Sequence, residues 1–301
     1  MKFSVFQVSR KGERLKNEDR MGYCYTRSSA VLILADGMGG HPEGEVAAQL
    51  ALQAISALFQ KQAHPELLDV PQFLSEALLT AHRHILRYAV SRDALDSPRT
   101  TIVVAVLQDG RVSWTHCGDS RLYLVREGAL LTRSKDHSLL EQNLVRTPRA
   151  SAPNRNVLFS CLGSPTKPVF RVAGPMTLHH ADRIMLCSDG LWANVSEDDI
   201  VSELSTKPVN QAVPDLVEKA LREGGATCDN VTCLALEWAF LDALEHFPDS
   251  VSTDAISDEV FASTVQAGWP DTAGDDLDDA AIERSIAEIN AAIRRSAVKK
   301  V

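Results

Sequence analysis

The chain has no long hydrophobic run. Its aliphatic stretches are short, such as VLILA at residues 31–35, whereas a membrane-spanning helix needs about 20 apolar residues in succession. The first ten residues, MKFSVFQVSR, are interrupted by Ser4, Gln7 and Ser9 and so lack the continuous apolar core of a signal peptide. We therefore predict no membrane association and a cytoplasmic location.

The sequence also has no basic stripe. The net charge of -9 is concentrated at the C-terminal end: residues 239–301 contain 13 Asp and Glu but 5 Lys and Arg, whereas residues 1–238 are nearly neutral. Nucleic-acid binding depends on clustered Lys and Arg that neutralise phosphates. The charge distribution therefore predicts no nucleic-acid partner.

Six cysteines are present, but no two have the CxxC spacing of a zinc knuckle or a redox pair. They are spread widely along a chain that is long enough to build a sizeable core without disulfide bonds. We expect free, buried thiols.

The periodicity of apolar residues indicates an α+β fold. Strand-like runs occupy residues 2–8, 31–35, 100–107, 111–117, 121–127, 182–188 and 231–238, and helical spacing occupies residues 43–60, 71–91, 197–205 and 209–223. Turn signals such as Asp109-Gly110 lie between consecutive strands and favour antiparallel hairpins. The sequence predicts a β-sandwich of antiparallel sheets flanked by helices.

The composition changes after Trp238. Residues 245–279 are rich in Asp, Ser, Thr and Ala, which is typical of a flexible linker. Residues 279–295 place four isoleucines at spacings of four, three and four, which predicts an amphipathic helix. We predict a folded body at residues 1–238 and an acidic extension at residues 239–301, whose helix docks on the body or on a partner.

Four aspartates occur at strand ends beside small residues. They lie in LADG (34–37), CGDS (117–120), CSDG (187–190) and CDN (228–230), and Glu18 and Asp19 lie in KNEDR, near the first predicted strand. Each motif alone is typical of an ordinary turn. Several carboxylates can converge only when a cation offsets their repulsion, and oxygen ligands favour Mg²⁺ or Mn²⁺.

Arg14 stands four residues before Glu18 and can reach an anion held beside such a cation. A planar guanidinium suits bidentate recognition of phosphate. Carboxylates, hard divalent cations and one arginine together indicate phosphoryl transfer. A cysteine-dependent phosphatase is excluded, because no cysteine is followed six residues later by arginine; Cys117 has Tyr123 there and Arg121 too early.

These motifs resemble the metal-dependent serine/threonine protein phosphatases of type 2C, in particular the bacterial branch. The resemblance runs in order through GERLKNEDR (12–20), LADGMGGH (34–41), TT (100–101), CGDSRLYL (117–124), KDHS (135–138), NVLFSCLG (156–163), CSDGLW (187–192) and CDNVT (228–232). It implies a central sandwich of two antiparallel sheets between layers of helices. It also implies phosphorylated Ser/Thr proteins, the targets of a Ser/Thr kinase, as substrates.

The resemblance further assigns site residues. Asp36 would bridge two Mn²⁺ or Mg²⁺ ions, one of them completed by the Gly37 carbonyl, Asp189 and Asp229. Asp19 would serve the other ion, and Glu18 would act largely through bound water. Asp119 would hold a third, weaker ion, and Arg14 would grip the substrate phosphate. His137 and Arg121 would be structural hydrogen-bonding residues.

The implied mechanism is in-line attack on phosphorus by a water that bridges the two ions. Met38 stands where eukaryotic relatives have a histidine proposed as general acid. Bound water is then favoured over His41 as the proton donor. The segment after DHS is shorter than in many bacterial relatives. We expect its Arg146, Arg149 and Arg155 to lie in a solvated loop, with the attraction of acidic phosphopeptides as the alternative.

A second class of function is open: an inactive family member that binds phosphopeptides or acts as a scaffold. Such proteins usually lose a metal ligand, whereas every matched position is intact here.

Overall fold

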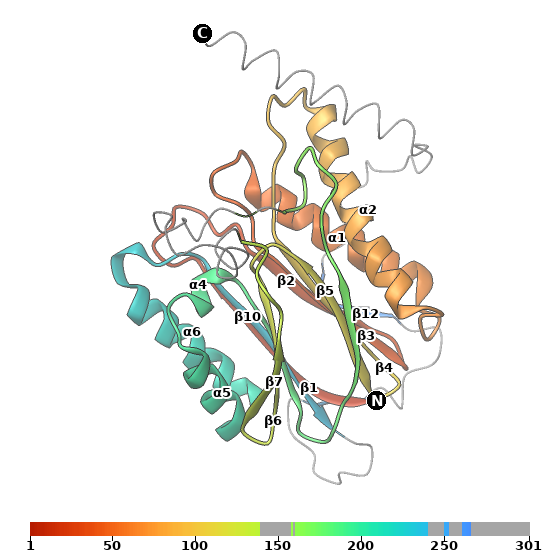
Figure 1. The fold of residues 1–301 in the computed structure, drawn as a ribbon, viewed down its shortest axis with the longest axis vertical. Coiled ribbons are helices and arrows are strands. Elements are labelled where there is room, and N and C mark those ends of the chain that lie inside the picture. Colours follow the sequence, from red (N-terminus) through yellow and green to blue (C-terminus); the bar gives the residue numbers. More distant parts are fainter. Residues whose placement is uncertain (139–157, 159, 240–249, 253–260, 266–301) are drawn as a thin grey trace, which may run out of the picture.

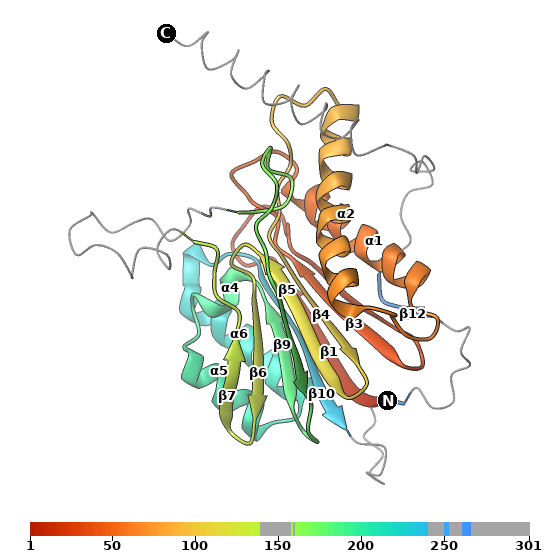
Figure 2. The ribbon, with the colours of Figure 1, turned by 45° about the vertical axis from the view of Figure 1, so that its right-hand side comes forward.

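The structure, a computed structural model, describes residues 1–138, 158, 160–239, 250–252 and 261–265. Its strands are β1 (Lys2–Arg10), β2 (Arg20–Tyr25), β3 (Ser29–Ala35), β4 (Ile102–Gln108), β5 (Arg111–Cys117), β6 (Arg121–Arg126), β7 (Ala129–Arg133), β8 (Val172–Thr177), β9 (Arg183–Cys187), β10 (Val231–Ala239), β11 (Ser250–Ser252) and β12 (Ala262–Ser263). They form two antiparallel sheets, in the orders β11-β1-β10-β9-β6-β7 and β12-β2-β3-β4-β5-β8. The sheets lie face to face, as Figures 1 and 2 show.

Helices cover the outer face of each sheet (Figure 2). The helical elements are α1 (Gly44–Gln62), α2 (Val70–Ser91), α4 (Asp189–Trp192), α5 (Glu197–Thr206), α6 (Val209–Gly224) and the 3₁₀ turn η1 (Gly225–Thr227). The apolar faces of α1 and α2 pack on the sheet that contains β3 and β4. Those of α5 and α6 pack on the sheet that contains β9 and β10. The predicted four-layer α/β/β/α sandwich is confirmed.

Alternate residues of the central strands enter different cores. Val31 and Ile33 of β3 face the helices, whereas Leu32 and Leu34 face the opposite sheet. Successive side chains of a strand point to opposite faces, so a strand with both faces buried must be apolar throughout. This explains why VLILA is a continuous apolar run.

The four predicted helices that fall within the described residues begin and end within two residues of α1, α2, α5 and α6. Five strands were not predicted: β2, β7, β8 and the two short strands of the extension, β11 and β12. β2 contains Gly22, and β7 is partly exposed along its length. β8 contains Gly174 and Pro175 and lies at a sheet edge, where a missing N–H donor is tolerated. Such strands carry a weak alternation of apolar and polar residues.

Two described pieces of the extension are ordered against the body, so the prediction of a flexible linker was wrong for them. β11 pairs with β1, and β12 pairs with β2. The Phe261 ring lies 6.3 Å from that of Phe59 in α1, and the Thr264 N–H donates to the Tyr23 oxygen over 3.0 Å. The division at residue 238 stays a prediction. The predicted helix at 279–295 and Arg146, Arg149 and Arg155 lie outside the described residues.

All six cysteines are free and buried, as expected. Among the described residues, no helix combines the length and the apolar character that crossing a bilayer requires.

Candidate active site

A cleft of about 850 Å³ opens at one end of the sandwich, where the turns after β3, β5 and β9 meet the turn before β10. The predicted site residues that line it are Arg14, Glu18, Asp36, Gly37, Asp119, Asp189 and Asp229. Asp19 lies behind this lining with 3% of its surface exposed. The fold thus brings together residues that are more than 200 positions apart in the chain.

Asp36 is fixed at the end of β3 by its main chain. Its carbonyl oxygen accepts hydrogen bonds from the Thr101 N–H and the Thr100 hydroxyl, each over 2.8 Å. The next residue must be glycine, because a Cβ on Gly37 would lie 2.5 Å from the carbonyl group of Gly44. The start of α1 therefore passes directly against the turn that presents Asp36.

Asp19 is held deep between the two sheets. Its Oδ2 accepts a hydrogen bond from the Ser188 hydroxyl over 2.8 Å, whereas its Oδ1 has no partner among the described residues. An unpaired buried carboxylate oxygen costs free energy unless a cation or proton meets it. Burial accordingly raises the pKa of Asp19 to about 7.

The pKa values of the other carboxyl groups in the cleft are also raised. Burial raises the pKa of Asp36 well above its ordinary value, with further contributions from the charges of Asp19 and Asp189. Burial and the charge of Asp229 raise the pKa of Asp189 to about 6. Burial and the charge of Asp189 raise the pKa of Asp119 to about 7. These carboxyl groups repel one another unless positive charge enters the cleft.

The donor set fits hard divalent cations. Among the described residues, no three His, Cys, Asp or Glu side chains already close on a single point. Mg²⁺ and similar ions commonly keep several waters and take only one or two protein carboxylates each, so a closed cage is not required. The unpaired Asp19 Oδ1, the predominance of carboxylates among the possible ligands in the lining and the raised carboxyl pKa values are consistent with such ions.

Arg14 supplies the cationic edge of the cleft. Its Nη2 donates to Asp229 Oδ2 over 2.6 Å, and 55% of its side chain is exposed. The hydrogen bond and charge of Asp229 raise the pKa of Arg14. The guanidinium is therefore always charged, lies against a predicted cation ligand and has free access to a ligand in the cleft.

Two supporting residues were not predicted. Asn230 accepts from the Glu18 N–H over 2.8 Å and donates to the carbonyl oxygens of Lys11 and Lys16 over 2.7 and 2.9 Å. Ser188 hydrogen bonds to Asp19 and receives the Thr232 N–H over 3.0 Å. Both lie in the CSDG and CDN motifs, beside the aspartates that drew attention to those motifs.

His41 lies in the cleft wall. Its Nδ1 is 2.8 Å from Asp96 Oδ2, and Asp96 also accepts from Arg99 over 3.1 Å. His137 and Arg121, expected to be structural, both make internal hydrogen bonds: His137 Nδ1 accepts from the Gly118 N–H, and Arg121 pairs with Asp136.

Solved structures of bacterial serine/threonine phosphatases have the same fold of two packed antiparallel sheets. The structure of the Mycobacterium tuberculosis serine/threonine phosphatase PstP/Ppp matches with a TM-score of 0.68 and 31% identity, over 80% of this chain and all of that chain. The PstP catalytic domain in complex with two manganese ions matches with a TM-score of 0.67 and 30% identity, over 79% of this chain and 99% of that chain.

Sequence comparisons agree. M. tuberculosis serine/threonine protein phosphatase PstP is 34% identical over 74% of this chain, which spans only 42% of that protein's length. Listeria monocytogenes serine/threonine phosphatase stp is 31% identical over 77% of this chain and 94% of that protein. The family model of protein phosphatase 2C matches residues 7–223. The chain belongs to the protein phosphatase 2C family.

Proposed function

We propose that this protein hydrolyses phosphoserine and phosphothreonine in proteins with the help of Mn²⁺ or Mg²⁺. The observation that carries the proposal is the cleft itself, in which buried aspartates with raised pKa values, one of them with an unpaired oxygen, lie beside an accessible arginine. The phosphatase relatives and the manganese-bound neighbour support the same reading.

We assign the ligands as the family resemblance implies. Asp36 would be shared by two ions, with the Gly37 carbonyl, Asp189 and Asp229 on one and Asp19 on the other. Glu18 would act through water, and Asp119 would hold a further ion. When bound, such ions supply an activated water nucleophile and positive charge opposite the phosphate oxygens.

The chain's own residues bind and orient the substrate. Arg14 would exchange its hydrogen bond to Asp229 for one to the phosphate, because the Asp229 carboxylate would then bind a cation. Asn230 holds the loop of Arg14 and Glu18 against the turn of Asp229, so it keeps the phosphate-binding and cation-binding groups in register. Positioning of this kind is a large part of catalysis in phosphoryl transfer.

The leaving Ser or Thr oxygen needs a proton. Met38 carries none, and its place in the cleft is fixed by a hydrogen bond from its N–H to the Arg99 oxygen over 2.9 Å. Water would be the favoured donor. His41 is the protein group that could replace it, because Asp96 orients its ring.

The test is hydrolysis of p-nitrophenyl phosphate and of a phosphothreonine peptide with Mn²⁺, Mg²⁺ or EDTA. We expect wild-type turnover to require Mn²⁺ or Mg²⁺ and to fall at least about 100-fold in Asp36→Asn. The control is Asp198→Asn, which alters an exposed carboxylate in the first turn of α5, outside the cleft, and should leave turnover unchanged. An inert wild-type protein that still binds the phosphopeptide would overturn the proposal in favour of a phosphopeptide-binding or scaffolding role.

A further inference from the structure

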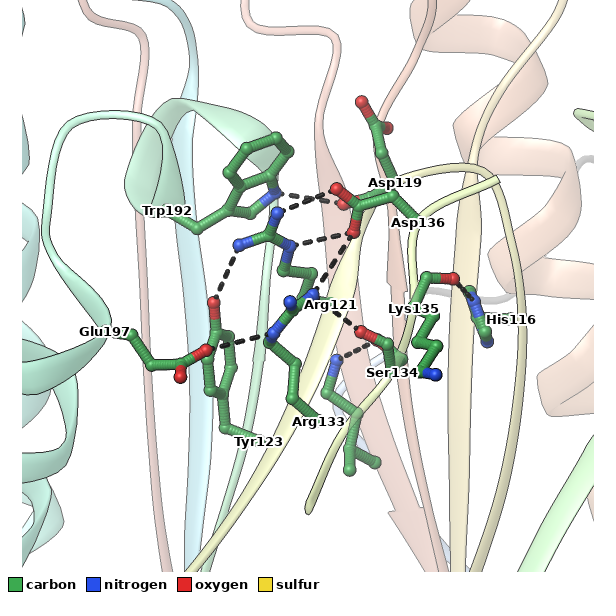
Figure 3. Close-up of polar contacts among 11 residues, drawn as sticks. His116, Asp119, Arg121, Tyr123, Arg133, Ser134, Lys135, Asp136, Trp192 and Glu197 are labelled. Carbon is green, nitrogen blue, oxygen red and sulfur yellow. Dashed lines mark hydrogen bonds and ion pairs between the residues drawn. The ribbon is translucent and has the colours of Figure 1, made fainter. Parts of the chain in front are cut away.

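Behind the cleft, a cluster of charged and aromatic side chains connects the turn of Asp119 to helix α4 (Figure 3). Trp192, the last residue of α4, donates its indole N–H to the main-chain oxygen of Asp119 over 2.9 Å. Because α4 begins at Asp189, one short helix links the two turns that carry Asp119 and Asp189. In Figure 3 the Asp119 carboxylate points away from the indole, and it lines the cleft.

Arg121 holds the Trp192 ring from its face. The guanidinium carbon lies 3.5 Å from the ring centroid, within cation–π distance. Nε and Nη2 of Arg121 donate to the two Asp136 oxygens over 2.8 and 2.7 Å, and Nη1 donates to the Tyr123 hydroxyl over 3.2 Å. With 15% and 8% of the Arg121 and Asp136 side chains exposed, this bidentate pair is well shielded from water.

The residues on either side of Asp119 are also held by hydrogen bonds. The His137 N–H donates to the Gly118 oxygen over 2.8 Å, and the Gly118 N–H donates to His137 Nδ1 over 3.3 Å. On the other side, the Ser120 and Thr101 hydroxyls are 2.6 Å apart. Each residue of the turn therefore has a partner from another element.

This support has a physical purpose. Asp119 and Asp189 both line the cleft and repel each other when ionised, so their turns would relax apart on a soft framework. A rigid framework keeps the Asp119 and Asp189 carboxylates at a fixed separation, so that a cation can bind beside them. Groups behind metal ligands commonly alter metal affinity by 10–100-fold without touching the metal.

We propose that Arg121, Asp136 and Trp192 act together as positioning residues that fix the Asp119 carboxylate relative to Asp189 and thereby set the affinity of the cation that Asp119 holds. The inference rests on the proposed function, since it takes the cleft to bind divalent cations. It goes further by assigning a role to residues that contact neither cation nor substrate.

The experiment titrates the full chain with Mn²⁺ alone, following bound ion by electron paramagnetic resonance. Trp192→Phe keeps an aromatic face under Arg121 but removes the indole N–H, and Arg121→Lys keeps the charge but removes the bidentate pair. We expect each to weaken the weakest-bound Mn²⁺ about tenfold, with the tighter ions changed less than about twofold. Asp119→Asn should abolish that weakest site, and adding Trp192→Phe to it should have no further effect.

The chain offers matched controls for both variants. The buried Trp238 indole N–H has no acceptor among the described residues, so Trp238→Phe removes a donor that does nothing at the cleft. Arg126, at the other end of β6, makes the same bidentate pair with Asp182, over 2.7 and 2.6 Å. Arg126→Lys should therefore lower thermal stability about as much as Arg121→Lys and leave Mn²⁺ binding unchanged.

Activity gives a second readout. For Trp192→Phe, the Mn²⁺ concentration at half-maximal turnover should rise about tenfold, while turnover at saturating Mn²⁺ returns to within about twofold of wild type. Rescue by the ion separates a positioning role from a catalytic one.

Equal effects of Trp192→Phe and Trp238→Phe, or of Arg121→Lys and Arg126→Lys, on Mn²⁺ binding would overturn the proposal. So would a wild-type protein that binds no Mn²⁺. A wild-type protein that binds Mn²⁺ normally but hydrolyses no phosphopeptide would overturn the proposed function alone, and the Mn²⁺ titrations would still decide the positioning role.

Discussion

Replacing Asp19 by asparagine should stabilise the metal-free protein while weakening its response to Mn²⁺. Asp19 is buried, one of its oxygens is unpaired, and its pKa is about 7 against an ordinary value of 3.8. Folding therefore favours the protonated carboxyl. The stability that this gives is complete below about pH 4 and is lost as the pH rises through about 7.

The size of the effect follows from that difference in pKa. A change from 3.8 to about 7 corresponds to at most about 4 kcal/mol of lost folding stability above pH 7. Part of it reflects repulsion by Asp189 and Asp229, which relaxation of the cleft can relieve. We expect Asp19→Asn to raise the free energy of unfolding by about 2 kcal/mol at pH 8 in EDTA, and to change it little at pH 4.

The assay is urea unfolding of wild type and variant at both pH values, in EDTA and in excess Mn²⁺. Mn²⁺ should stabilise wild type strongly at pH 8 and the variant much less, because a ligand bound only by the folded state stabilises it by mass action. The control is Asp182→Asn: that carboxylate is equally buried but paired with Arg126, so its loss should cost about 2 kcal/mol. If Asp19→Asn destabilises the EDTA form at pH 8 as Asp182→Asn does, the reasoning fails.

Three further predictions concern the phosphate, the proton and the extension. Arg14→Ala should raise KM for a phosphopeptide about tenfold or more and change Mn²⁺ affinity less than about threefold, because the guanidinium is exposed and pairs with one predicted ligand, Asp229. Isothermal titration with Mn²⁺ checks the second part, and a fall in Mn²⁺ affinity as large as the rise in KM would contradict it. His41→Gln should lower kcat for p-nitrophenyl phosphate and for a phosphothreonine peptide by the same factor, because water is the expected proton donor. The leaving oxygen of the peptide needs a proton, so a fall in kcat at least about tenfold larger for the peptide would instead make His41 the donor. Ending the chain after Ala239 should lower the melting temperature by about 4 °C or more, since β11 and β12 then no longer cover the edges of β1 and β2. Ending it after Val265 keeps both strands and should cause no change. Equal melting temperatures of the two shortened chains in a thermal scan would show that the two strands contribute nothing to stability.

Much of the fold was predictable because its central elements are locally distinctive. The spacing of Phe73, Leu74, Ala77 and Leu78 defines the buried face of α2, and the run at 31–35 defines a strand buried on both faces. β8 was missed for the opposite reason. Its Gly174 and Pro175 argue against a strand, and only its position at the edge of the sheet makes them acceptable.

The site divides in the same way. Asp36, Asp119, Asp189 and Asp229 were found because each ends or begins a strand beside a small residue, and all of them line one cleft. Ser188 and Asn230 were missed because nothing local marks a serine or asparagine as a support. Their roles come from partners such as Asp19, which is 169 residues from Ser188.

The sequence by itself determined the layered α+β architecture, the acidic chemistry of the site and the family resemblance, because hydrophobic period and short motifs are properties of neighbouring residues. Only the tertiary structure decided which oxygen of Asp19 is unpaired, that the indole of Trp192 joins the turns of Asp119 and Asp189, and that two strands of the extension complete the sheets. These facts depend on distances between segments far apart in the chain. Burial, mutual repulsion and hydrogen-bond geometry arise only when the fold brings those segments together.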